Sequence, residues 1–402
     1  AKLSVLVFGE HNWSVRLPAM VFGVAGIAVM WSLARLASGA LQAHATALLI
    51  AFSYHHVWYS QSARGYTEIM FWCVLSTIIL LRNRDQRTWA GWIAFGLVNA
   101  LAAYTHLTAL FFVAAQAIYI ALVVFRDEFL GTGAVKRDAW LQPLVAFLIT
   151  GVLTLLVYAP HMMTVLDSVA ELPETSKGAI SAYTSPIWTV QHILDSFGVN
   201  TPLMWLITLS AICMTGIGMV SMFRKEPAVP IIFVLHITIM LLTLLALSMR
   251  IWPRFFFIDM GFVLLFMVDG VFVCSQFIAK MAARVAPRKL SGNGLFVLAA
   301  CVMLAVSVDL LKRNYQYPKQ DWDGLAAYLG ESMQSQDRLV GLASASVPLE
   351  SYFLLDAVKI KSLGALIANQ TDKGATWVVV MFPGLMDRRY PEVIQELEEH
   401  YT

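Results

Sequence analysis

Charged residues are scarce in this sequence. Only 13% of the 402 residues are Asp, Glu, Lys or Arg, whereas 58% are hydrophobic and the mean hydropathy is +0.67. A soluble globular domain has roughly a quarter of its residues charged. The composition therefore excludes an ordinary soluble protein and indicates an integral membrane protein. The formal net charge of +2, spread over separate short stretches, also gives no basis for nucleic-acid binding.

Metal-binding, redox and nucleotide-binding motifs are missing from the sequence. No CxxC occurs, and no His or Asp stands at ligand spacing from the four cysteines. The cysteines lie in apolar runs, and we interpret them as packing residues: Cys73, Cys213, Cys274 and Cys301. No glycine-rich phosphate loop is found in the C-terminal part. The sequence thus predicts no metal site and identifies no cofactor, while a divalent metal ion stays undecided.

Long apolar runs, by contrast, are abundant. About 20 apolar residues cross the ~30 Å core of a bilayer. Ten segments approach this length: 17–35, 43–60, 66–81, 89–105, 107–125, 140–159, 202–223, 229–249, 255–279 and 293–311. We therefore expect an all-α membrane domain of about ten transmembrane helices within residues 1–312.

The positive residues predict how these helices are oriented, because Lys and Arg accumulate on the cytoplasmic side. If the first segment runs inward, the inner connections hold most of them: Arg35, Arg82, Arg84, Arg87, Arg126, Lys136, Arg137, Arg224, Lys225, Lys280, Arg284, Arg288 and Lys289. The outer connections then hold Lys2, Arg16, Arg64, Lys177, Arg250 and Arg254. We therefore expect residues 53–71 on the extracytoplasmic side.

Two further stretches predict structure outside the bilayer. The outer connection 160–201 is long for a turn, and its part 185–197 sets apolar residues on one side of a helix, which predicts a helix along the membrane surface. After Lys312 the composition becomes that of a soluble domain, with Asp321 as a helix cap. Helical and strand patterns alternate there: 322–333, 338–342, 347–356, 377–382 and 391–400. We expect a small extracytoplasmic α/β domain over residues 313–402.

Polar and ionisable residues gather at the predicted outer ends of the helices. They come from separate connections: His55, His56, Tyr59, Gln61, Arg64, Tyr66, Glu68, His106, His161, Arg250 and Arg254. Such residues are costly near a bilayer and often mark a functional cavity, and the planar arginine fork suits phosphate. We infer a site for an anionic lipid headgroup such as a polyprenyl phosphate. The alternative is structural, since Arg64 and Glu68 are spaced to pair on a helix and Tyr, Trp and His are common at the interface.

Two ionisable residues lie inside apolar segments, namely His236 and Asp269. Counted from the outer ends of their helices at about 1.5 Å per residue, both lie roughly 20 Å deep. Pairing would offset the cost of burying either side chain. We therefore expect His236 and Asp269 to form a structural pair.

Four stretches resemble a known family: FGEHNWSVRLPAMVFGV, WYSQSARGY, WPRFFF and YPKQDWDGLAAYL. They are similar to the polyprenyl-phosphate-dependent membrane glycosyltransferases of the GT-C fold, in the branch of the dolichyl-phosphate-mannose protein mannosyltransferases and the bacterial lipid A aminoarabinose transferases. The resemblance implies a multi-pass protein of the bacterial inner membrane. It also implies transfer of a sugar from a polyprenyl-phosphate carrier to an acceptor on the outer face, with inversion at the anomeric carbon.

The resemblance also implies roles for individual residues. Gln61, Arg64 and Tyr66 match the motif beside the catalytic cavity. Arg254 matches the arginine that opens a late helix and faces the lipid phosphate. The RLP motif at 16–18 matches a structural element, with its proline suited to a first helical turn.

Two departures from the family pattern leave the activity open. Ser62 stands where family members have an acidic residue. The family's catalytic aspartate belongs to a first outer loop that would precede Ala1, and Glu10 matches a different acidic position. No catalytic residue is assigned, and we expect it in an upstream segment. The alternatives are a non-catalytic structural or assembly subunit of a membrane complex, and a transporter or flippase, for which the loop pattern shows no inverted repeat.

Overall fold

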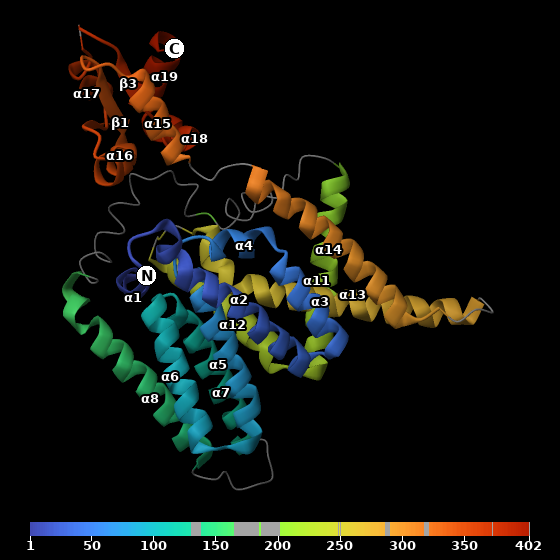
Figure 1. Cartoon of the computed structure of the whole chain (residues 1–402). Helices are drawn as coiled ribbons and strands as arrows, with labels where there is room; N and C mark the ends of the chain where they lie inside the picture. Colours follow the sequence, from blue (N-terminus) through green and yellow to red (C-terminus); the bar gives the residue numbers. More distant parts are fainter. Residues whose placement is uncertain are drawn as a thin grey trace. The chain divides into compact units, whose positions relative to one another are not determined.

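The structure, a computed structural model of the chain, describes residues 1–129, 138–164, 185, 202–247, 249, 251–285, 290–316, 321–371 and 373–401. The chain divides into two compact units, one made of the helices up to Gln316 and one made of the residues after it (Figure 1). Each unit has its own hydrophobic core.

The first unit is helical throughout the described residues. Its helices are α1 (Lys2–Phe8), α2 (Asn12–Ala37), α3 (Ala40–Ala51), α4 (Tyr54–Ser60), α5 (Tyr66–Gln86), α6 (Trp89–Thr105), α7 (Ala109–Phe129), α8 (Asp138–Tyr158), η1 (Ala159–His161), α11 (Pro202–Lys225), α12 (Ala228–Ala246), η3 (Pro253–Phe256), α13 (Phe257–Val285) and α14 (Gly292–Gln316). Among the described residues, seven helices are long and apolar enough to cross a membrane: α2, α7, α8, α11, α12, α13 and α14. With one exception, each segment predicted from the sequence coincides with a single helix, and the chain is a multi-pass integral membrane protein.

The exception is the predicted segment 43–60, which is broken into α3 and α4. The first helix ends at Ala51 with Phe52 as its C-cap. Ser53 caps the second helix, because its hydroxyl accepts a hydrogen bond from the backbone N–H of His56 at 3.4 Å. Ser60 of α4 lies directly against Gly23 of α2, where a Cβ atom would collide with the serine hydroxyl. The prediction of one spanning helix here was wrong, since the cap and the close packing on α2 stop the helix.

The first two helices are joined through a carbonyl group that a proline leaves free. Pro18 has no N–H, so the carbonyl oxygen of Ser14 has no helical donor. The hydroxyl of Ser4 in α1 donates to that oxygen at 2.6 Å. The sequence predicted Pro18 in a first helical turn, but it lies inside α2, because His11 and Ser14 form a capping box further upstream.

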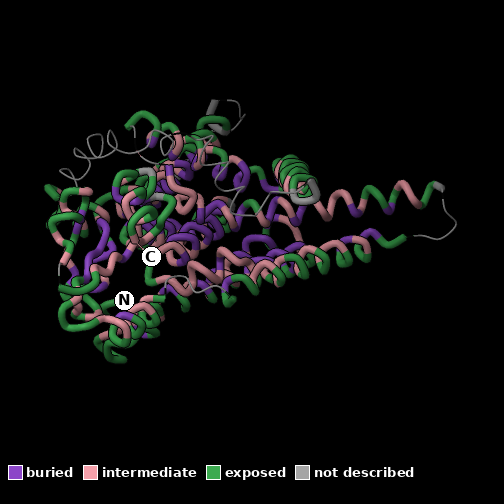
Figure 2. Tube along the Cα trace, turned by 90° about the horizontal axis from the view of Figure 1, so that it is seen from above, coloured by how far each residue is buried: buried purple, intermediate pink, exposed green. Residues whose placement is uncertain are grey.

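Glycines allow the most extensive helix contact of the described residues, between α11 and α13. A Cβ atom at Gly218 would collide with the carbonyl oxygen of Phe266, and one at Gly270 with the carbonyl oxygen of Met214. The two backbones therefore touch directly at this crossing. Figure 2 shows the buried residues concentrated in the middle of the helix bundle, whereas the end of α13 and the start of α14 are more exposed.

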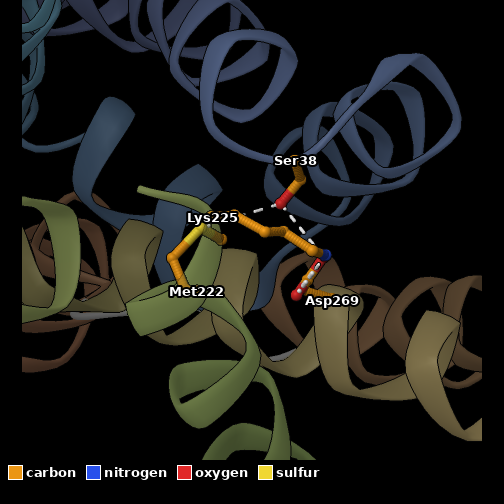
Figure 3. A network of polar contacts seen from close by, with 4 residues as sticks. All are labelled: Ser38, Met222, Lys225 and Asp269. Atoms are coloured by element: carbon orange, nitrogen blue, oxygen red, sulfur yellow. Dashed lines mark hydrogen bonds and ion pairs between the residues drawn. The ribbon is translucent and has the colours of Figure 1, made fainter. Parts of the chain in front are cut away.

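Two ion pairs surround the point where α11 passes into α12. The Nζ atom of Lys225 lies 2.7 and 2.9 Å from the carboxylate oxygens of Asp269, which also accepts a hydrogen bond from the hydroxyl of Ser38 at 3.1 Å (Figure 3). The next residue, Glu226, accepts two hydrogen bonds from the Arg84 guanidinium of α5 at 2.6 and 2.7 Å. Adjacent charges of opposite sign thus connect the ends of several helices.

Asp269 therefore does not pair with His236, and that prediction was wrong. The Nδ1 atom of His236 instead lies 2.8 Å from Oδ1 of Asp259, near the start of α13. Helix α12 does face α13, since the Phe233 ring of α12 also lies 6.3 Å from that of Phe262 and 5.2 Å from that of Phe266. The register differs from the predicted one, however, and His236 meets Asp259 instead of Asp269, so equal depth counted from the helix ends did not identify the partner.

The second unit contains a three-stranded parallel sheet in the order β2-β1-β3. Its elements are α15 (Trp322–Ser332), β1 (Arg338–Leu342), η4 (Ala343–Ala345), α16 (Ser346–Phe353), β2 (Ala357–Ile360), α17 (Leu363–Ala368), β3 (Thr376–Val379), α18 (Pro383–Arg389) and α19 (Pro391–His400). Val340 in β1 stands opposite Val358 in β2 and Val378 in β3. The sequence predicted an α/β arrangement here but not β2, α17 or α18, which are short.

Two aspartates organise the polar contacts of this unit. Asp321 caps α15, as predicted, and accepts a hydrogen bond from the N–H of Gly324 at 2.9 Å. Asp337 accepts hydrogen bonds from the N–H of Gln334 at 2.9 Å, from the indole of Trp377 at 3.0 Å and from the N–H of Ala375 at 2.7 Å. These bonds, that of Gln334 first, lower the pKa of the Asp337 carboxyl and connect the start of β1 with that of β3.

The predicted surface helix over 185–197 lies, apart from Ser185, outside the described residues. The acidic residues of the same long connection also lie outside them: Asp167, Glu171, Glu174 and Asp195.

Candidate functional site

Several helix ends that carry the predicted site residues meet at one end of the first unit. The turn Gln61–Gly65 joins α4 to α5, the loop that begins at His106 joins α6 to α7, and η3 leads directly into α13. Short connections make consecutive helices antiparallel, so the start of α5, the end of α6 and the start of α7 share one side of the bundle.

Aromatic rings are packed together at this end. The rings of Tyr59 and Tyr66 lie 4.9 Å apart. The ring of Phe257, the first residue of α13, lies 4.6 Å from that of Tyr59 and 6.3 Å from that of Tyr66. Tyr66 also lies 6.3 Å from the imidazole ring of His106. Three of these four residues were predicted from the sequence, and they form a surface between α4, α5, α13 and the α6–α7 loop.

Arg254 brings a positive charge to this surface. Its guanidinium carbon lies 5.0 Å from the ring centre of Trp252 and 5.9 Å from that of Phe255, within the range of cation–π attraction. Arg254 belongs to η3, which leads directly into Phe257, and its charge acts on His106 and on Tyr59. Its buried Nε atom has no hydrogen-bond partner among the described residues. We call Tyr59, Tyr66, His106, Arg254 and Phe257 the outer cluster.

Arg64 lies at the edge of the outer cluster. Its side chain is exposed, and its charge also acts on Tyr59. The structural alternative for Arg64 was a simple ion pair with Glu68, but the ion pairs of the described residues join other partners. Glu68 lies partly exposed in the first turn of α5. Among the described residues, the expected pair of Arg64 with Glu68 is therefore not formed.

His106 is neutral in this environment. Its Nδ1 atom accepts hydrogen bonds from the hydroxyl of Thr108 at 2.9 Å and from the N–H of Thr108 at 3.2 Å, so this nitrogen carries no proton. Burial lowers the pKa of the imidazole from its usual 6.5, and the nearby charge of Arg254 lowers it further. The positive charge of the cluster thus comes from arginine.

His56 has a structural position rather than a place in the outer cluster. Only 2% of the residue is exposed, and its Nε2 atom lies 3.0 Å from the carbonyl oxygen of Gly23. Its ring stacks on that of Phe257 at 6.3 Å. His56 therefore attaches α4 to α2 and supports Phe257 from behind.

The other predicted site residues have different surroundings. The ring of His55 lies edge-on to that of Tyr54 at 5.2 Å. The amide nitrogen of Gln61 donates to the hydroxyl of Tyr315 at 3.2 Å, which connects the α4–α5 turn to the end of α14. Arg250 lies outside the described residues.

The structure adds two residues that the sequence did not single out. Phe257 is the central ring of the outer cluster, and Trp252 lies against the Arg254 guanidinium. Both belong to the WPRFFF segment, but aromatic residues are common at membrane interfaces, so their presence alone gave no signal. In the part of the chain that the structure describes, no group of three or more His, Cys, Asp or Glu side chains is arranged to hold a metal ion.

Comparisons with known proteins agree with this architecture. Residues 1–164 match the family model of dolichyl-phosphate-mannose-protein mannosyltransferase. The structure of ArnT from Cupriavidus metallidurans in the apo state is similar to the whole of this chain over 79% of its own length, with 13% identity and a TM-score of 0.53. The structure of the same protein bound to undecaprenyl phosphate is also similar to the whole of this chain. The similarity covers 83% of that protein's length, with 14% identity and a TM-score of 0.53. No curated protein matches the sequence.

The chain has the GT-C fold. The resemblance that four sequence stretches predicted is thereby confirmed for the fold, and the family match covers the part that contains α4, α5 and the α6–α7 loop. At 13–14% identity the likeness concerns the arrangement of helices. Since one fold hosts many activities, the function of this GT-C protein has to be argued from the outer cluster itself.

Proposed function

We propose that this protein is a membrane glycosyltransferase that takes a sugar from a polyprenyl-phosphate carrier and transfers it to an acceptor on the extracytoplasmic face. One observation carries the proposal. In a chain of the GT-C fold, Arg254 lies among aromatic rings, its charge and that of Arg64 both act on Tyr59, and its buried Nε atom has no partner among the described residues.

The outer cluster suits a lipid phosphate for two reasons. A guanidinium group offers several N–H donors in one plane, which match the oxygens of a phosphate. A buried donor without a partner is unfavourable, so a ligand that accepts from Arg254 gains the bond at little further desolvation of the protein. Neutral His106 and the two tyrosines add polar groups without competing negative charge.

An apolar groove supports a carrier with a long hydrocarbon tail. It lies between α6 and α8, has a volume of about 450 Å³, and is lined by aliphatic side chains only: Leu97, Val145, Leu148, Ile149, Val152 and Leu153. Leu97 stands nine residues before His106 on α6, which at about 1.5 Å per residue is roughly 13 Å along the helix. The helix that brings His106 to the cluster thus also borders a groove fit for a prenyl chain.

The proposed reaction is a direct displacement at the anomeric carbon. An acceptor oxygen forms a bond to that carbon from the face opposite the carrier, and the bond from the carbon to the phosphate oxygen breaks. The electron pair leaves with the phosphate, where Arg254 and Arg64 stabilise the added charge. The acceptor proton passes to a base. Attack from the opposite face inverts the anomeric centre.

Binding of undecaprenyl phosphate to the purified protein in nanodiscs tests the phosphate site. A charge-assisted hydrogen bond contributes about 1.5–3 kcal/mol, so Arg254→Ala should raise the Kd about ten-fold or more. Arg254→Lys keeps the charge but loses the fork, so its Kd should lie between those of the wild type and the alanine variant.

The matched control is Arg35→Ala, which removes an exposed arginine from the other end of α2. Its Kd should stay within about two-fold of the wild type. Unchanged affinity of Arg254→Ala would remove Arg254 from the site. Release of undecaprenyl phosphate from undecaprenyl-phosphate-linked mannose or aminoarabinose, dependent on Arg254, would distinguish an enzyme from a subunit that only binds the carrier.

A further inference from the structure

We propose that His236 and Asp259 form a positioning pair that fixes the start of α13 and thereby holds Arg254 in the orientation that binds phosphate. The inference rests on the proposed function and adds to it two residues from within the membrane-embedded core. The two residues act on the placement of Arg254 and not on the ligand directly, because neither side chain belongs to the outer cluster.

The pair is short and fully enclosed. The Nδ1 atom of His236 lies 2.8 Å from Oδ1 of Asp259, and the two residues are 0% and 3% exposed. The ring of Phe112 from α7 lies 5.3 Å from the His236 ring. Helix α13 also packs against α5. Asp259 is therefore bonded to α12 and enclosed by α5 and α7, so the first turn of α13 has little freedom to rotate.

Asp259 is close to Arg254 along a rigid stretch of chain. Arg254 lies in η3, and α13 begins directly after η3 with Phe257. Asp259 follows two residues later in the first turn of α13. Phe257 is also the central ring of the outer cluster. A rotation of the first turn of α13 would therefore displace Phe257 and Arg254 together. The ring of Phe233 in α12 also contacts Phe262 and Phe266 further along α13, so the polar pair is the contact that joins α12 to the first turn of α13.

The energetics favour a role in positioning over a role in stability. Two polar groups lose water when they are buried, and a well-packed apolar pair of similar volume is often equally or more stable. What a hydrogen bond adds is direction, because it weakens steeply when its angle departs from linear. The pair also leaves two buried polar atoms without partners among the described residues, namely Nε2 of His236 and Oδ2 of Asp259. These unpaired atoms reduce what the pair contributes to stability.

A direct catalytic role is not compatible with the surroundings of the pair. An aspartate bonded to Nδ1 with a free Nε2 is the arrangement of catalytic histidines. In this protein, however, His236 has no exposed surface, and the Phe112 ring lies against it. A substrate cannot reach this nitrogen, so the pair acts through Arg254.

The test replaces both partners by leucine, His236→Leu with Asp259→Leu, in the full-length protein in nanodiscs. We expect the melting temperature to stay near that of the wild type and the Kd for undecaprenyl phosphate to rise about ten-fold. The control is the double variant Lys225→Met with Asp269→Leu, which removes the other ion pair of α13, a partly exposed lysine with a buried aspartate. Its Kd should remain within about two-fold of the wild type. Wild-type affinity in the His236–Asp259 variant would overturn the proposal.

A ligand-independent measurement keeps the proposal testable if a variant folds poorly or the wild type does not bind this lipid. Phenylglyoxal reacts with guanidinium groups, and peptide mass spectrometry reports the reaction of Arg254 alone. Asp259→Ala should raise this rate several-fold, whereas Asp259→Asn, which still accepts a hydrogen bond from His236, should restore it to near the wild-type rate. Equal rates in all three proteins would refute the positioning role. Lack of lipid binding by the wild type with altered Arg254 reactivity would instead refute the proposed function.

Discussion

The outer cluster, with Arg64 at its edge, combines positively charged side chains with neutral polar ones. Arg254 and Arg64 supply the positive charge. His106 accepts a hydrogen bond from Thr108 and lies beside Arg254, so it stays neutral. The fold keeps His106 neutral, and this affects how stability depends on pH. The unfolded chain binds a proton at this side chain more readily than the folded chain does.

The pH dependence of stability should therefore carry a contribution from His106. Its folded-state pKa lies below the usual value of 6.5. The resulting stabilisation is present above about pH 6.5 and is lost as the pH falls toward the folded-state pKa. The groups that face the ring are the Arg254 guanidinium, the Tyr66 ring and Thr108. We expect the melting temperature of His106→Gln to fall less than that of the wild type between pH 7.5 and 5.5.

A suitable control for this measurement is His161→Gln, which removes an exposed histidine at the end of η1. Its pH profile should coincide with that of the wild type. If the profile of His106→Gln also coincides with the wild type, the imidazole takes up protons equally in the folded and unfolded states, and the fold does not hold His106 neutral.

At the level of whole helices, the sequence predicted a helix correctly wherever one property, the length of an apolar run, determined it. Long apolar runs predicted most of the helices, with ends that differ from the observed ones by several residues, because the bilayer requires such runs. The same reasoning failed at Ser53, where a local cap and a close contact at Gly23 divide an apolar run. It also missed β2, a strand of four residues whose place is set by β1 beside it.

The crossing of α11 and α13 gives a prediction for element packing. Gly218→Ala and Gly270→Ala each place a methyl group on the facing backbone, and overpacking of this kind costs about 1–3 kcal/mol or more. Gly216→Ala in the same helix α11 meets no atom within 4 Å. Because alanine is the better helix former, this change should be neutral or stabilising by up to about 1 kcal/mol. Thermal unfolding in detergent compares the three variants.

The result that would contradict this packing is equal stability of all three glycine variants. It would mean that α11 and α13 have room to separate at no cost, so that backbone contact is not what fixes their distance. A loss confined to Gly216→Ala would place the tight face of α11 on its other side.

At the scale of the molecule, most residues of the candidate site could be named from the sequence, because they are polar or ionisable side chains at the ends of apolar helices. Arg64, Arg254, His106, Tyr59 and Tyr66 are costly side chains at helix ends, and the sequence identified all of them. The partner of His236 was not predictable, since it depends on how α12 crosses α13 rather than on depth in either helix. Phe257 was missed because an aromatic ring at an interface is expected whether or not it lies in a site.

The orientation of the whole chain in the membrane follows from the same distribution of charge. Lys and Arg gather in the connections 82–87, 126–137, 224–225 and 280–289, which the positive-inside rule places in the cytoplasm. The outer cluster lies at the opposite helix ends. We therefore expect the outer cluster and the unit that follows α14 to be extracytoplasmic, where a transferase of the proposed kind meets its acceptor.

Single-cysteine labelling in intact cells tests this orientation. In a background without the four native cysteines, Gln86→Cys lies at the exposed end of α5 and Lys361→Cys lies on the exposed surface of the second unit. A membrane-impermeant maleimide should label Lys361→Cys in intact cells, and Gln86→Cys only after the membrane is permeabilised. Labelling of Gln86→Cys in intact cells would reverse the topology. It would also place Arg254 on the cytoplasmic side, so that the sugar carrier and the acceptor of the proposed reaction would have to be sought there.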